Sequence, residues 1–536
     1  MSRLFLGLDA STQSLSGIVI DFDTGRMVHD ASVNFDQALP EYGTKNGVLR
    51  VEDPRVVHAP PLMWVEALDM LLDRMKKADV PMGDIRAIAG SGQQHGSVYL
   101  NRTAEHMLGA LTPDRLLAPQ LKEIFSRRTS PIWMDSSTSV ECEEIERALG
   151  GRVATVQATG SAMYERFTAA QIRRFAKTEP AAYENTSHIT LVSSFLASVL
   201  TGRITPIDHG DGAGMNLMDI RSKEWHPDAL RATAPGLRAK LPALSNPWNM
   251  AGVIHPYFGK YGISPDTQCG VWTGDNPSSL IGLGLTRPGI LAISLGTSYT
   301  CFGAMNECRI DPEGEGHVFV SPTGDYMSLI CFKNGALARE RVRDQFGLDW
   351  PTFRRLVESV PPGNNGGMML PYFDPEIVPK VLVPGVRRHR LTDADAAANC
   401  RAICESQAYS MRLHSAWMGV KPDRIYITGG ASADSSFVKI IADVFQCPVY
   451  RQECTNSAAL GAALRAANMG LAADGAAHEW SDIVGRFAAP AESSRVDPDP
   501  ALAKMYDVHM HVYNELETSV LSSPDEDVES TEGEHS

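Results

Sequence analysis

Short apolar runs that end in polar turns recur along the chain and predict buried strands. Two such runs open the sequence, at residues 4–8 and 17–21, with a hydroxyl-bearing turn between them. The same order returns far downstream, where residues 290–295 and 299–303 enclose a Gly-Thr-Ser turn. A repeated unit of strand, polar turn and strand predicts a duplicated domain.

Further strands and helices are predicted elsewhere in the chain. Three more strand-like runs end in polar loops, at residues 85–89, 270–273 and 425–428. Apolar positions at three- and four-residue spacing predict helices at about residues 62–76, 168–178, 395–419, 435–446 and 455–467. Because strands and helices alternate, the predicted fold class is α/β.

Four parts are expected along the chain. The two copies of the domain would span residues 1–287 and 288–475, and a helical extension would follow at residues 476–521. Residues 522–536 are rich in acidic residues and have almost no apolar side chains to bury. We therefore expect this last segment to be a disordered acidic tail.

Charge and cysteine usage narrow the class of protein. The 536 residues include 49 basic and 64 acidic side chains, and no basic run could track a phosphate backbone, so nucleic acids and anionic membranes are poor partners. No apolar stretch approaches the ~18–20 residues of a membrane span. The nine cysteines are dispersed without a C-x-x-C pair, which indicates reduced thiols. We expect a soluble, cytoplasmic protein.

No common nucleotide-binding signature occurs. The chain has neither a P-loop nor a G-x-G-x-x-G after a strand, so a phosphate ligand would need another device. The hairpin turns around Thr12 and around Gly296 and Thr297 are candidates, since turn N–H groups and hydroxyls form anion-binding concavities. Plain hairpins with surface hydroxyls remain the alternative. The glycines before residue 431 permit close approach of a ligand, or only a tight turn.

Two carboxylates follow predicted strands. Asp275 precedes Asn276 and a proline, where a helix is expected to begin. It is either the helix N-cap or, if Asn276 caps the helix instead, a base that accepts a proton from a substrate hydroxyl. Asp9 ends the first strand, and its oxygens suit a Mg²⁺ ion that keeps several waters.

Three further side chains are candidates with ordinary alternatives. His95 lies in a glycine-bounded loop and is by default a structural histidine, while Arg166 lies beside a predicted helix start and is by default an ion-pair residue. Trp133 belongs to the core or offers an apolar face to a sugar ring. None of the three is diagnostic alone.

Ten short motifs nevertheless occur together, in one order, between residues 4 and 467. They are GLDASTQ (7–13), GQQHGS (92–97), WMDSST (133–138), YERFT (164–168), LVSSF (191–195), GAGMNL (212–217), TGDNP (273–277), SLGTS (294–298), CFKNG (331–335) and TGGAS (428–432). This set resembles the FGGY carbohydrate kinases, and within that family the animal-type D-xylulose kinases.

The resemblance implies a fold and an activity. Members of the family have two actin-like domains, each built on a ribonuclease-H-like sheet, with the sugar and the ATP phosphates in the cleft between them. The implied reaction is ATP-dependent phosphorylation of D-xylulose to D-xylulose 5-phosphate, with Mg²⁺ as cofactor and a small sugar and ATP as the only partners of a monomer or homodimer.

The resemblance also implies roles for particular residues. Asp275 would be the general base, and Asp9 would support the metal. The sugar would lie against His95, Arg166, Asn276, Gln94 and Trp133, with Asp275 beside it. The ATP phosphates and adenosine would lie against Thr12, Gly296, Thr297, Trp350, Gly430, Ala431 and Asp434.

Two positions, Ser11 and Gln94, depart from the wider family, and Asp434 stands where relatives can place Asn. Ser11 stands where most members have glycine, so its β-carbon would limit the approach of phosphate. Gln94 stands where many bacterial relatives have Met, and it either adds a hydrogen bond to the sugar or faces the loop.

Two alternatives to a xylulose kinase remain at this stage. One is a kinase for another ketose or polyol, such as ribulose or glycerol. The other is a non-catalytic sugar-binding regulator with the same fold, because a fold does not determine an activity.

Overall fold

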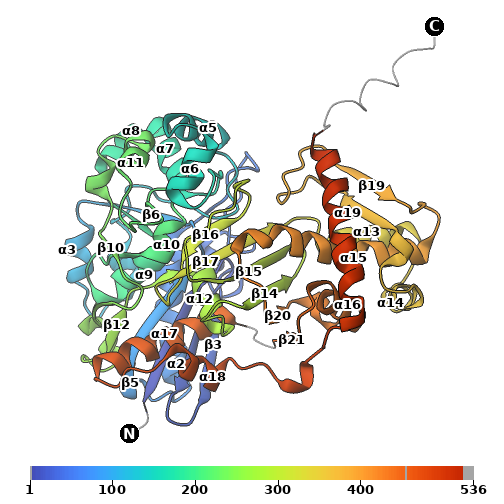
Figure 1. Cartoon of the computed structure of the whole chain (residues 1–536). Coiled ribbons are helices and arrows are strands. Elements are labelled where there is room, and N and C mark those ends of the chain that lie inside the picture. The colour runs from blue at the N-terminus through green and yellow to red at the C-terminus, as the bar shows by residue number, and fades with distance from the viewer. Residues whose placement is uncertain (1–2, 453–455, 523–536) are drawn as a thin grey trace. The chain divides into compact units, whose positions relative to one another are not determined.

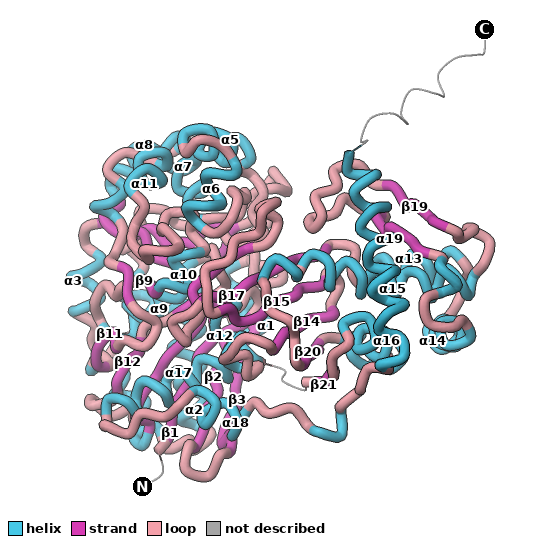
Figure 2. The backbone as a smooth tube through the Cα atoms, viewed as in Figure 1, coloured by secondary structure: helices cyan, strands magenta, loops and turns pink. Residues whose placement is uncertain are grey.

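The computed structural model describes residues 3–452 and 456–522, which divide into two compact units (Figure 1). The first unit contains residues 3–287, 304–327 and 456–489, and the second contains residues 288–303, 328–452 and 490–522. Helices and strands alternate through the chain (Figure 2), which confirms the expected α/β class.

The first unit is built on a mixed sheet. Strand β1 (Leu4–Ala10) pairs antiparallel with β2 (Ser14–Asp21) and parallel with β5 (Ile85–Gly92). The full order is β11-β12-β5-β1-β2-β3, and β13 also pairs with β5. The remaining strands of this sheet are β3 (Arg26–Asn34), β11 (Met250–Val253), β12 (Gln268–Gly270) and β13 (Thr273–Gly274).

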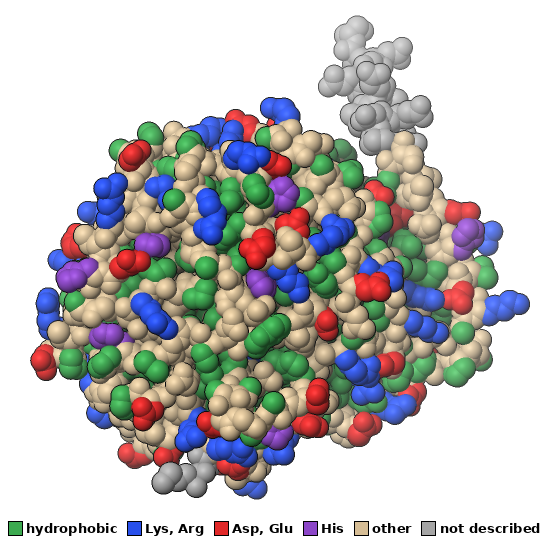
Figure 3. Space-filling model, turned by 60° about the vertical axis from the view of Figure 1, so that its left-hand side comes forward, with side chains coloured by type: hydrophobic (Ala, Val, Ile, Leu, Met, Phe, Trp, Pro, Cys, Tyr) green, Lys and Arg blue, Asp and Glu red, His purple; other side chains and the backbone are tan. Residues whose placement is uncertain are grey.

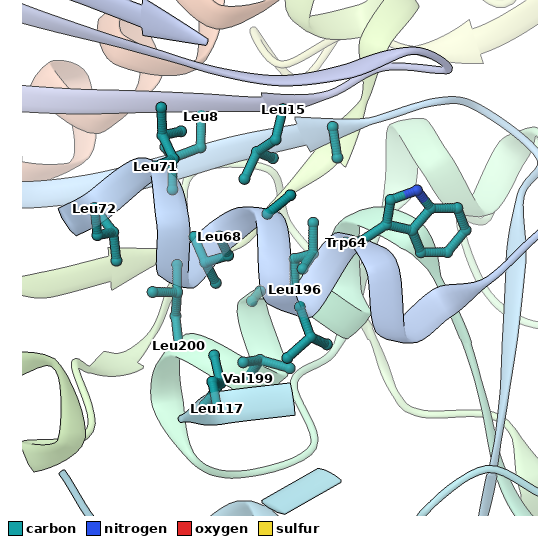
Figure 4. Close-up of a cluster of buried hydrophobic side chains, with 14 of the residues drawn as sticks. Leu8, Leu15, Trp64, Leu68, Leu71, Leu72, Leu117, Leu196, Val199 and Leu200 are labelled. Carbon is teal, nitrogen blue, oxygen red and sulfur yellow. The ribbon is translucent and has the colours of Figure 1, made fainter. Parts of the chain in front are cut away.

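Alternation along β1 places apolar side chains on both faces of this sheet. Leu4, Leu6 and Leu8 join a core with α2 (Pro61–Lys77) and α9 (Val192–Thr201). Figure 4 shows this core, with Leu68, Leu71 and Leu72 of α2 near Leu8 and with Leu196 and Leu200 of α9. On the opposite face, Phe5 joins a second core with α17 (Ser457–Ala473).

Glycine permits very close packing beneath that second face. A β-carbon at Gly7 of β1 would lie 2.2 Å from the Ala459 carbonyl oxygen of α17. Helix α12 (Asp275–Gly282) approaches α17 in the same way: a β-carbon at Gly461 would lie 1.8 Å from the Ser278 carbonyl oxygen. The contact at Ser278 holds α12, whose first residue is Asp275, closely against α17.

The rest of the first unit consists of short strand pairs and helices. Its strands are β4 (His58–Ala59) with β7 (Ser130–Pro131), β6 (Ser97–Asn101) with β8 (Thr186–Leu191), β9 (Ile207–Asp208) with β10 (Leu244–Ser245), and β16 (His317–Val320). Its other helices are α1 (Phe35–Ala38), α3 (Ala104–Gly109), α4 (Leu117–Leu121), α5 (Ser139–Ala148), α6 (Arg152–Thr159), α7 (Thr168–Thr178), α8 (Pro180–Asn185), α10 (His209–Ala213), α11 (Pro227–Thr233) and α18 (Trp480–Phe487).

The second unit repeats the pairing of the first. Strand β14 (Ile290–Leu295) is antiparallel to β15 (Tyr299–Met305) and parallel to β20 (Arg424–Thr428), as β1 is to β2 and β5. The expected duplication of the hairpin is therefore present. The strands that lie wholly or partly in this unit follow the order β17-β15-β14-β20-β21. The other elements are β17 (Tyr326–Phe332), β21 (Val449–Arg451), the pair β18 (Met368–Tyr372) and β19 (Gly385–His389), and helices α13 (Ala336–Gln345), α14 (Trp350–Ser359), α15 (Ala396–His414), α16 (Ser435–Phe445) and α19 (Ala503–Ser522).

Local periodicity predicted the main elements, whereas the grouping of late segments is a structural finding. The helix expected at residues 395–419 ends earlier, at His414. The first segment of the first unit ends at residue 287, and α17 and α18 pack with that unit rather than with residues 288–452. Of the expected acidic tail, Ser522 ends α19, and residues 523–536 lie outside the described residues.

The surface carries charged side chains of both signs. On the face shown in Figure 3, basic and acidic side chains are intermingled. Within residues 3–452 and 456–522, every helix is too short or too polar to span a bilayer.

Candidate active site

Two carboxylates lie at the carboxyl ends of two strands that both pair in parallel with β5 in the first unit. Ser91 of β5 stands opposite Asp9 of β1 on one side and opposite Thr273 of β13 on the other. Asp275 follows β13 directly as the first residue of α12. The carboxyl end of a parallel sheet is where α/β proteins place their ligands, so this edge is the first candidate site.

Burial makes both carboxylates weaker acids than usual. Desolvation raises the pKa of Asp9 to about 7, with a further contribution from the charge of Asp275, while the Ser91 hydroxyl donates to Asp9 Oδ1 at 2.8 Å and opposes the shift. Desolvation also raises the pKa of Asp275 to about 6. A carboxylate with a pKa near neutrality can accept a proton during a reaction and release it afterwards.

Neither Asp275 nor Asn276 caps the helix, so both capping interpretations are wrong. Gly274 occupies the N-cap position of α12, and no side chain caps that end. The Asp275 carboxylate instead accepts hydrogen bonds at Oδ1 from the Gln94 main-chain N–H (3.3 Å) and from Asn276 Nδ2 (3.1 Å). Asn276 Nδ2 also donates to Gln94 Oε1 at 2.9 Å.

His95 is held as a neutral imidazole. Its Nδ1 lies 2.7 Å from the Gly214 carbonyl oxygen, and because a carbonyl only accepts, the proton is on Nδ1. Burial, assisted by the positive charge of Arg166, lowers the pKa of His95 to about 3. Nε2 is therefore an acceptor, and the ring is further held by stacking on Phe167 with a centroid distance of 4.2 Å.

Arg166 lies in the same aromatic cluster and is oriented by a residue far along the chain. Its Nη2 lies 3.0 Å from Nε2 of His317, and its guanidinium carbon lies 4.7 Å from the centre of the Tyr164 ring. Burial and the charge of Arg166 lower the pKa of His317 well below its usual value, so His317 accepts from Arg166. The structure thus places Arg166 beside His95, through the shared neighbour Phe167.

Trp133 contacts the first hairpin turn. Its Nε1 donates a hydrogen bond to Thr12 Oγ1 at 2.9 Å, while 45% of the tryptophan surface remains exposed. Because the Thr12 oxygen accepts from the indole, its own proton is directed elsewhere and can be donated to an anionic ligand.

The second unit presents a parallel arrangement at its own sheet. Ser294 of β14 stands opposite Thr428 of β20, so the turn with Gly296 and Thr297 and the loop after β20 share one edge. Gly429 has a φ of +88°, and a β-carbon there would lie 2.8 Å from the Leu295 carbonyl group. A β-carbon at Gly430 would contact nothing within 4 Å, so a ligand can approach this backbone closely.

Asp434 and Trp350 are linked by arginines in this second unit. Asp434 caps α16 and lies 3.7 Å from Arg339 and 3.6 Å from Arg354. The Arg339 guanidinium carbon lies 5.9 Å from the centre of the Trp350 ring. Asp434, Trp350, Gly430 and Ala431 therefore lie close together, and the Asp434 charge is balanced by two cations.

The expected site residues fall into one set in each unit. The first unit holds Asp9, Thr12, Gln94, His95, Trp133, Arg166, Asp275 and Asn276, and the second holds Gly296, Thr297, Trp350, Gly430, Ala431 and Asp434. Sequence reasoning did not single out His317, Ser91 or Asp211, a buried carboxylate whose charge interacts with that of Asp275. Asp211 lies in the short helix α10, and His317 lies in a run without a distinguishing local signal.

The first unit contains a carboxylate that could bind Mg²⁺ together with phosphates and waters. Within the described residues, no group of three or more His, Cys, Asp or Glu side chains could hold a metal ion. Mg²⁺ is commonly held by one or two carboxylates with phosphates and waters. Asp9, a buried carboxylate near the carboxyl end of β1, meets that requirement.

Comparisons with known proteins agree with this geometry. The chain matches the model of the "FGGY family of carbohydrate kinases" N-terminal domain over residues 128–282 and the C-terminal domain over residues 291–469. It is 42% identical over 488 residues to "Xylulose kinase 2" of Arabidopsis thaliana, covering 87% of each chain. It is 40% identical over 533 residues to "Xylulose kinase" of Rattus norvegicus, covering 97% of each.

The fold has close relatives among solved structures. A xylulose kinase from Rhodospirillum rubrum superposes with a TM-score of 0.81 at 21% identity, covering 97% of this chain and 99% of that one. This match confirms the expected fold of two actin-like, ribonuclease-H-like domains.

Proposed function

Because the chain belongs to the FGGY family of carbohydrate kinases, we propose that it transfers the γ-phosphoryl group of ATP to the C5 hydroxyl of D-xylulose. Relatives called xylulose kinases match nearly the whole chain, and this is the observation that carries the choice of sugar. The product is D-xylulose 5-phosphate, and ADP leaves.

Asp275 is the proposed general base. Its carboxylate, with a pKa near 6, is ionised at neutral pH and takes the proton of the C5 hydroxyl as the phosphoryl group arrives. The C5 oxygen forms the new bond to phosphorus, and the bond between phosphorus and the ADP oxygen breaks. Asn276 and the Gln94 main chain hold the carboxylate in place through Oδ1.

The other sugar contacts follow from the hydrogen-bonding capacity of each side chain. His95 Nε2 accepts from a sugar hydroxyl, because its Nδ1 proton is engaged by Gly214. Arg166 donates to a sugar oxygen with the N–H groups that His317 does not engage. Trp133 offers an exposed indole face to the sugar while its N–H holds Thr12.

The nucleotide contacts are assigned to turns and to an aromatic surface. Thr12, Gly296 and Thr297 donate to phosphate oxygens, and the adenosine lies against Trp350 and the backbone of Gly430 and Ala431, with Asp434 nearby. Mg²⁺, when bound, neutralises the charge on the transferring phosphates, and Asp9 is the carboxylate that would hold it.

We further propose a monomer or homodimer working in the cytoplasm. The nine cysteines are dispersed along the chain without a C-x-x-C pair, a pattern typical of thiols in a reducing compartment. Light scattering of the purified protein measures the assembly, and a tetramer or larger species would contradict this assignment.

A coupled assay of ADP release tests the proposed function. D-Xylulose, D-ribulose and glycerol are compared at equal ATP and Mg²⁺, with a reaction lacking sugar as the control. We expect the highest kcat/KM for D-xylulose, a weaker rate for D-ribulose and near-background turnover of glycerol, because unsatisfied donors in the site penalise a mispaired hydroxyl. A higher kcat/KM for either alternative, or no sugar-dependent ADP release, would overturn it.

A further inference from the structure

The side chain of Gln94 lies beside Asn276 in the first unit, and its oxygen is used in a hydrogen bond with that residue. Only 2% of the residue is exposed. Its Oε1 accepts from Asn276 Nδ2 at 2.9 Å, and its Nε2 has no hydrogen-bond partner among the described residues. Among the described residues, the side chain of Gln94 therefore forms its hydrogen bond with Asn276.

This bond determines which way the Asn276 amide faces. Both protons of Asn276 Nδ2 are used, one on Gln94 Oε1 and one on Asp275 Oδ1 at 3.1 Å. A flipped amide would place Asn276 Oδ1 against two oxygen acceptors, which is repulsive. The amide oxygen must then face the opposite side, as a fixed hydrogen-bond acceptor.

The importance of Gln94 increases when Asp275 works as a base. A carboxylate that takes up a proton is a weaker acceptor than the ionised group. The bond from Asn276 to Asp275 therefore weakens during phosphoryl transfer, while the bond to the uncharged Gln94 amide is unaffected. The hydrogen bond to Gln94 therefore holds the Asn276 amide in the same orientation throughout the reaction.

The surroundings of Gln94 hold it in this orientation. A β-carbon at Gly274 would lie 3.0 Å from the Gln94 carboxamide carbon and 3.1 Å from Asp211 Oδ1. A β-carbon at Gly214 would lie 2.9 Å from Gln94 Nε2. The absence of side chains at Gly274 and Gly214 thus leaves room for the Gln94 amide. Asp211, which accepts a hydrogen bond from Ser193 Oγ, also lies next to Gly274.

We propose that Gln94 is a positioning residue that acts on the sugar through Asn276: it fixes the Asn276 amide so that Oδ1 accepts a hydrogen bond from a sugar hydroxyl. The proposal rests on the proposed sugar site and replaces a direct contact between Gln94 and the sugar. It predicts that the two side chains contribute to sugar affinity as one unit.

A double-mutant cycle separates the two roles. Gln94→Met keeps the length of the side chain but removes the acceptor, and we expect the sugar KM to rise roughly 10-fold, the loss of one well-aligned hydrogen bond. The ATP KM and kcat should stay within about threefold. With Asn276→Ala already present, Gln94→Met should add less than about twofold, because residues that act as one unit are not additive.

A conservative variant supplies an independent readout. Gln94→Glu keeps an oxygen acceptor for Asn276, so the sugar KM should return to within about threefold of wild type at pH 8. The second carboxylate should also move the acidic limb of kcat/KM to higher pH, because a like charge raises the pKa of Asp275. Thermal unfolding of every variant verifies that the first unit is folded.

The outcomes that overturn this inference differ from those that overturn the function. Equal effects of Gln94→Met in the wild-type and Asn276→Ala backgrounds would mean that Gln94 contacts the sugar itself. The cycle uses whichever sugar the wild-type enzyme prefers, and sugar dissociation constants replace KM if turnover is absent. A different preferred sugar therefore revises the proposed function, while non-additivity still supports the positioning role.

Discussion

At the scale of single residues, Asp275 is expected to contribute most to catalysis. Asp275→Asn keeps the size of the side chain and can still accept a hydrogen bond, but it cannot take a proton. We expect turnover to fall by about 10²–10⁴-fold with sugar affinity preserved. Single-turnover kinetics and a sugar-binding titration measure the two effects, with the exposed Asp266→Asn as the control. Turnover within a few-fold of wild type would contradict the assignment.

The raised pKa values of the two carboxylates predict the pH dependence of catalysis. Asp275 must be ionised to act as a base, so kcat/KM should decrease as the pH falls through about 6. Protonation of Asp9 near 7 weakens its hold on a metal and broadens the same limb. A pH profile of kcat/KM at saturating Mg²⁺ measures this. An acidic limb centred near 4, the value of an ordinary aspartate, would exclude a buried base.

The desolvation that raises the pKa of Asp275 also lowers the stability of the folded protein at neutral pH. A carboxyl whose pKa is raised in the folded protein binds its proton more tightly there, so its contribution to stability decreases as pH rises from about 4 through about 6. Asp275→Asn removes the desolvated charge of this half-buried side chain and should stabilise the protein at pH 8 by about 1–2 kcal/mol. Melting curves at pH 8 and pH 4.5 test this. An equal gain at both pH values would show that charge is not the cause.

The candidate site shows what local sequence can predict at this scale. Asp9, His95 and Asp275 stand out because each follows an apolar run at a polar turn. The capping interpretations of Asp275 failed because main-chain geometry puts the N-cap one residue earlier, at Gly274. His317 could not be found in this way, since the contact that orients Arg166 joins residues 151 positions apart.

At the scale of elements, the contact between α12 and α17 is the most sensitive to a single added methyl group. A β-carbon at Gly461 would lie 1.8 Å from a backbone oxygen of α12, which cannot move aside alone. Gly461→Ala should destabilise the first unit by at least about 2 kcal/mol and reduce activity, because α12 carries Asp275.

An exposed glycine in a neighbouring helix gives the matched control. Gly485 lies in α18, and a β-carbon there would contact nothing within 4 Å. Gly485→Ala should be neutral or stabilise by up to about 1 kcal/mol, because alanine loses less conformational entropy in a helix. Chemical denaturation of both variants decides the matter. Equal stability of Gly461→Ala and wild type would mean that the two helices separate easily.

Periodicity predicted the helices and strands themselves but not all of their partners. A helix was expected at about residues 455–467 from the spacing of its apolar positions, and α17 covers Ser457–Ala473. Its location against β1 depends on Gly7, Ala459 and Ala463 fitting together backbone to backbone. Shape complementarity between segments 450 residues apart leaves no periodic trace in either segment.

At the scale of the whole molecule, the last described helix is part of the second unit. Glu517 of α19 is 2% exposed and accepts hydrogen bonds from the Tyr372 hydroxyl at 2.6 Å and from His414 Nε2 at 2.9 Å. Tyr506 of the same helix donates to Glu405 at 3.0 Å. Losing these groups would leave buried polar partners unsatisfied.

Two truncations separate this helix from the acidic segment after it. Ending the chain after residue 502 should lower the melting temperature of the second unit and expose apolar surface. Ending it after residue 522 removes only the acidic segment and should leave melting temperature and turnover unchanged, because that composition buries little. Calorimetry and ADP-release assays compare the two. A large loss of stability from the shorter deletion would refute the expected tail.

The return of α17 to the first unit also has a consequence for how the protein is made. The second face of β1 is buried by a helix that begins at residue 457, whereas β1 itself begins at residue 4. At roughly 5–20 residues per second, the ribosome needs on the order of tens of seconds to supply that helix. During this interval, the sheet surface around Phe5 is uncovered. The nascent chain is thus a substrate for chaperones that shield apolar surface, and a premature stop before residue 457 should yield aggregated protein.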